Sequence, residues 1–194
     1  FWTGGAGDNN FSTAGNWSDS AQPTTGDVCI LAANPASGVD NIQGGDFRSL
    51  GNISLVVGPN WSGTVGKSNV ALRLSLTSLE YAGQSSVANI QGSDTVTMTD
   101  CIITDTGAGS MPLRIGGDVN ITNLTVTGGK GVIQIAAFTG GTPTVTNVSV
   151  IGTQRGTVVD MAYNGVISGT TARVNGGTLR INGNYTNVEV TLTL

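Results

Sequence analysis

The sequence lacks histidine altogether and is poor in charged residues. Lysine, arginine, aspartate and glutamate make up 10% of the 194 residues, against about 25% in an average soluble domain. Without histidine, the chain has neither the commonest general base nor the Ser–His–Asp and Cys–His arrangements, and most zinc sites are excluded. Glutamate and lysine, which favour exposed helix surfaces, are also scarce. Any catalysis would therefore depend on carboxylates, and helices are not expected.

Long apolar runs and clusters of positive charge are missing too. No run approaches the roughly 18 apolar residues that a membrane-spanning helix needs, and no basic-then-apolar signal peptide opens the chain. The sequence begins at Phe1, so we expect that a preceding segment was removed. The net charge is −4, and scattered basic residues do not neutralise a phosphate backbone. We therefore expect neither a nucleic-acid nor a membrane partner. The basic residues stand singly at Arg48, Lys67, Arg73, Arg114, Lys130, Arg155, Arg173 and Arg180.

Three aspartates are the best candidates for chemistry. Asp94, Asp100 and Asp105 fall within twelve residues, and a glycoside hydrolase needs two carboxyls about 5–9 Å apart. Asp94 and Asp105 sit among turn residues, where aspartate bonds its own backbone, and no basic or aromatic cluster accompanies them. A structural role is favoured over catalysis. The stretch from Gly4 to Asn9 approaches a calcium-binding glycine-rich repeat, but it occurs once, whereas such sites need tandem copies. We predict no catalytic residue, no metal and no cofactor.

The only cysteines are Cys29 and Cys101. They form no CxxC or metal-like spacing, and both lie beside apolar residues of expected strands. One disulfide is possible. The favoured interpretation is two buried free thiols that act as small apolar side chains.

Short alternating segments indicate an all-β fold. Each is four to six residues long and ends at Gly, Asn or Asp, as strands do. In residues 69–81 the alternation slips by one residue, which predicts a strand, a bulge and a second strand. Asparagine recurs at expected turns, where it either ladders inward between coils or tolerates left-handed geometry outside. The alternating residues of that segment are Leu72, Leu74 and Leu76, followed by Leu79 and Tyr81.

The segments also repeat. TNLTVTGG at 122–129 resembles TNVSVIGT at 146–153, and spacings of 17 to 26 residues without helices suit one coil per repeat. The sequence therefore predicts a single-stranded parallel β-helix, that is a β-solenoid, with a β-sandwich or jelly roll as the alternative. The anchors are Leu124–Val148, Val148–Val166, Val166–Val188, Ile53–Leu79 and Leu79–Val96.

Both ends of the sequence differ from its middle. Residues 1–40 place aromatics among turn residues, which predicts a cap over the first coil, with the solenoid over 41–194. Trp2, Trp17 and Trp61 are interpreted as packing residues rather than as a sugar-stacking platform. The final segment alternates without a polar cap, so we expect its strand to pair with another copy, as a homotrimer, or with a partner protein. The apolar residues of this expected interface are Val188, Val190, Leu192 and Leu194.

The first 83 residues resemble a known class of proteins. WTGGAGDNNFSTAGNWS at 2–18, PTTGDV at 23–28 and RSLGNISLVVGPNWSGTVG at 48–66, with ALRL at 71–74 and LEYAG at 79–83, are similar to segments of virion structural proteins from marine tailed bacteriophages. Looser versions occur in autotransporter-like surface β-helices of bacteria. The remainder resembles only generic β-helix repeats.

This resemblance implies a non-enzymatic virion structural protein at the particle surface. Capsid decoration or a head fibre is expected, often trimeric, with the major capsid protein as partner. The alternatives are a tail fibre or spike, or a bacterial surface adhesin, that binds host glycan.

Overall fold

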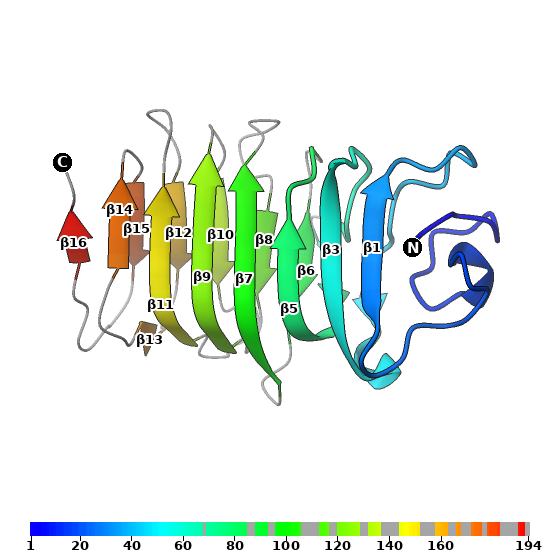
Figure 1. Cartoon of the computed structure of the whole chain (residues 1–194), viewed down its shortest axis with the longest axis horizontal. Coiled ribbons are helices and arrows are strands. Elements are labelled where there is room, and N and C mark those ends of the chain that lie inside the picture. Colours follow the sequence, from blue (N-terminus) through cyan, green and yellow to red (C-terminus); the bar gives the residue numbers. More distant parts are fainter. Residues whose placement is uncertain are drawn as a thin grey trace.

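Two parallel β-sheets carry the fold, and the chain passes from one to the other on each circuit (Figure 1). The computed structural model describes residues 1–67, 69–84, 88–92, 96–105, 113–116, 120–128, 132–136, 144–151, 158–162, 166–167, 172–175, 178–182 and 190–192. Strands that neighbour each other in a sheet are not consecutive in the chain. The result is an all-β solenoid with an aromatic cluster near the N-terminus, as predicted. Every pairing between the described strands of the two sheets is parallel, which excludes the antiparallel sandwich and jelly-roll alternatives.

The nine-stranded sheet forms one wall. Its strands follow the order β1 (Val28–Ala33), β3 (Asn52–Asn60), β5 (Ser75–Tyr81), β7 (Thr97–Asp105), β9 (Asn120–Gly128), β11 (Thr144–Ile151), β14 (Ala172–Asn175) and β16 (Val190–Leu192), while β13 (Val166–Ile167) pairs with β11.

The seven-stranded sheet forms a second wall. It contains β2 (Gly45–Asp46), β4 (Leu72–Arg73), β6 (Asn89–Gln91), β8 (Leu113–Gly116), β10 (Val132–Ala136), β12 (Val158–Ala162) and β15 (Thr178–Asn182). Two short 3-10 turns, η1 (Ala14–Asn16) and η2 (Arg48–Leu50), precede β1 and β3 of the nine-stranded sheet. Isolated parallel bridges join Ile42 to Val65 and Val65 to Ala88, which aligns the first coils on a third side.

Columns of buried side chains run through the stack. Leu55 pairs with Leu79, Leu79 with Cys101, Cys101 with Leu124, and Leu124 with Val148. The first four of these side chains are at most 1% exposed. Because parallel strands are stacked about 4.8 Å apart, each column forms a continuous apolar spine.

The register confirms one predicted anchor and corrects three. Leu124 pairs with Val148 as expected. Ile53 pairs with Leu76 rather than Leu79, and Leu79 pairs with Cys101 rather than Val96. Val148 pairs with Ala172 rather than Val166, and the Val166–Val188 anchor ends outside the described residues. The mistaken anchors followed large aliphatics, whereas the register places the smaller residues Cys101 and Ala172 opposite Leu79 and Val148.

The predicted bulge is present in β5. The register against β3 shifts between Ile53 and Ser54, so Thr77 is the extra residue. Its hydroxyl donates to the Ile53 carbonyl at 3.1 Å and lies 3.0 Å from the Ser54 hydroxyl. Later strands keep the same three-residue spacing between buried positions, as in Ile121 and Leu124, so their registers need no further shift.

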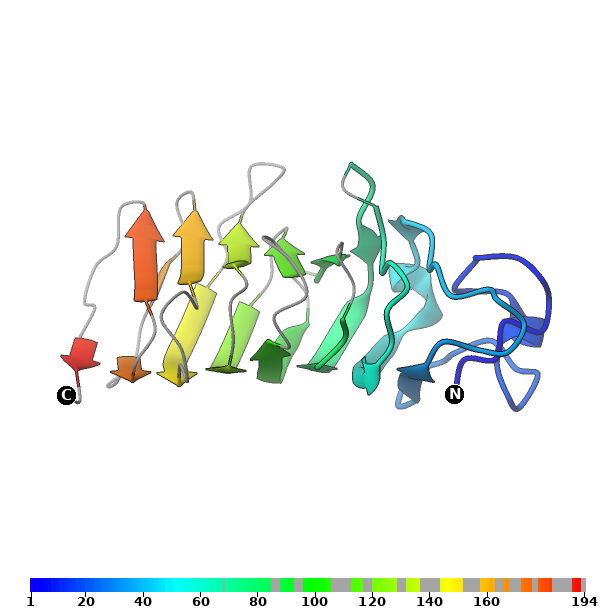
Figure 2. The ribbon, with the colours of Figure 1, turned by 90° about the horizontal axis from the view of Figure 1, so that it is seen from above.

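The N-terminal residues fold over the end of the stack beyond β1 (Figure 2). The Trp2 amide donates to the Ile30 carbonyl at 2.9 Å, and the Trp2 indole donates to the Val39 carbonyl at 2.8 Å. The rings of Trp2 and Trp17 meet edge to face at 5.4 Å, and those of Phe11 and Trp17 at 5.1 Å. This is the predicted aromatic cap. The segment 1–40 also contains β1, which pairs with β3 and is the first strand of the stack.

Close approach between coils demands glycine at specific turns. A Cβ built on Gly63 would overlap the backbone oxygen of Asp40 in the preceding coil. At Gly45 the nearest atoms belong instead to the ring of Phe47, a side chain that is able to shift. A substitution at Gly63 therefore tests a clash with fixed backbone, whereas the same substitution at Gly45 tests a contact with a side chain.

We expect Gly63→Ala to lower Tm by roughly 6–12 °C, because overpacking against a fixed carbonyl costs about 3 kcal/mol. Gly45→Ala is the matched control and should lower Tm by less than half as much. Thermal unfolding followed by circular dichroism measures both. Equal losses, or no loss at Gly63, would contradict the coil spacing described here.

Candidate functional site

Asn16 organises the cap from within. Its side chain is fully buried, and its Oδ1 accepts a hydrogen bond from the Ala6 amide at 3.1 Å. Its Nδ2 donates to the Asp8 carboxylate at 2.6 Å and to the carbonyls of Asp8 and Asn10 at 3.1 Å each. The amide of Asn16 thus holds the glycine-rich loop around itself.

The Asp8 carboxylate is committed to the same loop. Besides Asn16, it accepts hydrogen bonds from the Asn10 amide at 3.0 Å and the Thr13 hydroxyl at 3.1 Å. These bonds, led by the one from Asn10, lower the pKa of Asp8 below its ordinary value of 3.8. The segment from Gly4 to Asn9, which approaches a calcium-binding repeat in sequence, therefore forms a hydrogen-bonded loop. In this loop the Asp8 carboxylate accepts hydrogen bonds from protein donors.

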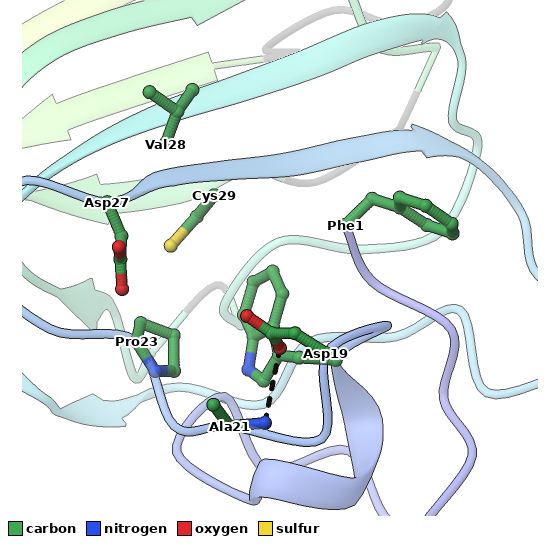
Figure 3. A pocket seen from close by; sticks show the side chains of 8 residues that line it. Phe1, Asp19, Ala21, Pro23, Asp27, Val28 and Cys29 are labelled. Carbon is green, nitrogen blue, oxygen red and sulfur yellow. Dashed lines mark hydrogen bonds between the residues drawn. The ribbon is translucent and has the colours of Figure 1, made fainter.

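A small pocket lies between the cap and the start of β1 (Figure 3). Its volume is about 90 Å³, well below the roughly 300–1,000 Å³ of typical ligand sites. The Asp19 carboxylate accepts from the Ala21 amide at 3.1 Å, and that of Asp27 from the Thr24 amide at 2.7 Å. Both carboxylates hold turns. The lining residues are Phe1, Trp17, Asp19, Ala21, Pro23, Asp27, Val28 and Cys29.

The two cysteines are free and buried, as the favoured interpretation expected. They occupy one column, with Leu55 and Leu79 between them. Three steps of about 4.8 Å separate them by roughly 14 Å, whereas a disulfide needs Cα atoms within about 7 Å. Burial raises the pKa of Cys29 to about 12 and raises that of Cys101 as well. Neither thiol is an activated nucleophile.

Of the three candidate carboxylates, the two on described residues do not form a catalytic pair. Asp94 lies outside the described residues. Asp100 and Asp105 both lie on β7, where five residues at about 3.3 Å each place their backbones roughly 16 Å apart, beyond the spacing of glycosidase pairs. Within the described segments, no three His, Cys, Asp or Glu side chains are placed to share a metal ion.

The tryptophans present no open ring to a sugar. Trp2, Trp17 and Trp61 are 3%, 5% and 0% exposed, in agreement with the packing interpretation. A search of the described residues finds no helix that is long and apolar enough to span a membrane.

A polar ladder crosses the outside of the nine-stranded sheet. The Asn147 amide donates to Asn123 Oδ1 at 2.9 Å, and the Asn123 amide donates to the Asp100 carboxylate at 3.0 Å. Asparagine was expected to ladder inward or to occupy turns. These three residues instead lie on strands with at least partly exposed side chains. The sequence signal for this outward ladder is the two-residue gap between the buried Ile121 and Leu124. Thr122 and Asn123, which fill that gap, are both partly exposed.

Charge is distributed unequally between the two walls. The seven-stranded sheet has strands of only two to five residues, yet they hold more charged residues than the longer strands of the nine-stranded sheet. The former contain Asp46, Arg73, Arg114, Asp160 and Arg180; the latter contain Glu80, Asp100, Asp105 and Arg173. The wide sheet is therefore the less charged wall.

The predicted interface strand is β16. Val190 and Leu192 lie on it and pair with Ala172 and Val174 of β14, while Val188 and Leu194 lie outside the described residues. Among the described strands, β16 pairs with β14 alone.

Comparisons of the chain with protein-family models, with curated proteins and with solved structures find no match. The fold and its surfaces are therefore the basis for a function.

The cap is expected to loosen in acid. The pKa of Asp8 is lower in the folded chain than in the unfolded one, so its contribution to stability is present above pH 3.8 and is lost as pH falls through the lowered value. Tryptophan emission should shift to the red in that range because Trp2 and Trp17 become hydrated. Asp8→Asn should show the shifted emission already at pH 7.

Asp46→Asn is the control for this titration. Asp46 bonds Arg48, which lowers its pKa to about 2, and both side chains are over 40% exposed, so the pair contributes little. The control should keep the wild-type transition. An Asp8→Asn chain with wild-type emission at every pH would contradict the role of Asp8.

Proposed function

We propose that this chain is a non-enzymatic structural protein of a virion surface, a capsid decoration or head-fibre protein that stabilises or decorates a phage particle through protein–protein contacts. The similarity of residues 1–83 to virion proteins supports the setting. The solenoid supports a role in which shape and stability do the work.

One observation carries the proposal: the polar side chains bind one coil to the next instead of converging on a site. Asn34 Oδ1 accepts from the Ser62 amide at 2.8 Å, and Asn41 Oδ1 accepts from the Thr64 amide at 3.0 Å. The Asp100–Asn123–Asn147 ladder does the same on the wide sheet. Such bonds stabilise a stack but leave no converging acid, base or nucleophile in the described part of the chain.

Self-association belongs to this proposal. Among the described strands β16 is the last of the nine-stranded sheet, and an unpaired edge there would offer backbone donors and acceptors for strand pairing. Val190 and Leu192 would then contact another copy, in a homotrimer, or the major capsid protein. Nucleic acid and membrane are not expected partners. Glycan binding by a tail fibre or a bacterial adhesin has less support, because the three indole rings are buried.

Immunogold electron microscopy tests the setting. Antibodies against the purified chain should label the heads of tailed phage particles that carry this protein. Label on tail tips would favour the spike alternative. Label on cell envelopes with none on particles would contradict the virion proposal.

The non-enzymatic half has its own test. The purified chain should release no reducing ends from bacterial surface polysaccharides. A release that disappears in the Asp94→Asn, Asp100→Asn, Asp105→Asn triple variant, while the Asp46→Asn control retains it, would contradict this half.

A further inference from the structure

The outer side of the nine-stranded sheet forms a continuous surface, here called the broad face. Its central column consists of Ile30, Val56, Glu80, Ile102, Thr125 and Ser149, each paired with the next. On the first five of these strands they alternate with buried residues, and none of the six is itself buried. The column therefore faces outward along six successive strands.

The broad face combines low charge with exposed apolar side chains. Glu80 is the one charged residue of the central column over these six strands, and the register continues the column to Arg173 on β14 and Thr191 on β16. Ile102 is 44% exposed, and Val28, on the edge strand β1, is 57% exposed. These two belong to a group of only four large apolar residues that are exposed in the described part of the chain. Depletion of charge marks the cores of protein interfaces.

Several polar groups on the broad face are already paired with one another. The Asp100–Asn123–Asn147 ladder and the 3.0 Å contact between the Ser54 and Thr77 hydroxyls join adjacent strands. Burying a donor or acceptor costs most when it is left without a partner. The broad face can therefore be covered with a smaller penalty than a surface of unpaired hydroxyls and amides.

Its size also suits an interface. Eight strands along the path from β1 to β16 at about 4.8 Å spacing, with about six residues across, give a face of roughly 700 Å². A stable interface buries about 800 Å² on each partner.

We propose that the broad face is the surface through which copies of this chain pack side by side. The proposal deepens the self-association included in the proposed function and rests on it. Each copy carries a net charge of −4, so copies repel at long range and meet most favourably where charge is scarcest. A partner recognised by charge complementarity would instead find its contacts on the seven-stranded sheet, with Asp46 and Arg73.

Light scattering on the full 194-residue chain tests this proposal with Ile102→Arg and its matched control Val70→Arg. Both replaced side chains are 44% exposed, but Val70 lies in the turn before β4. The wild type and Val70→Arg should have a mass that is a multiple of 19.6 kDa. Ile102→Arg should shift to the monomer mass, with association weakened at least tenfold. Thr125→Arg, on the next strand, should do the same, and circular dichroism should show all variants folded.

Other outcomes would overturn the proposal in distinguishable ways. Retention of the oligomer in both folded broad-face variants, with dissociation in a Val190→Lys chain that circular dichroism shows to be folded, would place assembly at β16 and leave the virion proposal intact. Dissociation of Val70→Arg would show that added charge acts anywhere on the surface. A monomeric wild type that binds a capsid protein through Ile102 would assign the broad face to that protein. The masses from light scattering do not depend on the result of immunogold labelling, so the two proposals can fail separately.

Discussion

The spacing of about 4.8 Å between parallel strands is the constraint on which the rest of this structure depends. At that spacing each side chain stacks on its register partners, so the inner columns must be apolar and the outer ones must tolerate close neighbours. Leu79, Cys101 and Leu124 meet the first requirement. The ladder of Asn123 and Asn147 meets the second, because amide side chains both donate and accept. The same spacing excludes a Cβ at Gly63.

A stack of this kind leaves unpaired backbone and apolar residues at its first coil. Here the N-terminal residues cover that coil with aromatic rings, and the Trp2 amide reaches the Ile30 carbonyl of the edge strand. The cap has no regular sheet of its own, so a single buried amide, Asn16, supplies much of its internal hydrogen bonding. Because the cap depends on the Asp8 carboxylate, we expect the cap to be destabilised at acid pH.

The solenoid, the aromatic cap and the bulge near Thr77 were predictable from the sequence, because each follows from local alternation or from aromatics in a turn-rich segment. The full register was not, since Cys101 and Ala172 fill column positions without being large aliphatics. The outward ladder was missed because Asn123 was assigned to a turn-like role rather than to the second of two outward residues on a strand. Unequal charge on the two walls was also hidden, because it depends on which strand joins which sheet. The virion setting comes from resemblance and has no counterpart in the fold.

If the stack is the basis of function, the protein acts through its surfaces: the capped first coil, the last described strand β16 and a broad face poor in charge. All three depend on parallel pairing between segments about 24 residues apart. Nuclear magnetic resonance measures this pairing directly through contacts between backbone protons of adjacent strands. The account predicts contacts that link Leu79 to Cys101, Cys101 to Leu124 and Leu124 to Val148. Contacts between strands that are consecutive in the chain, in the antiparallel pattern of a sandwich, would contradict it.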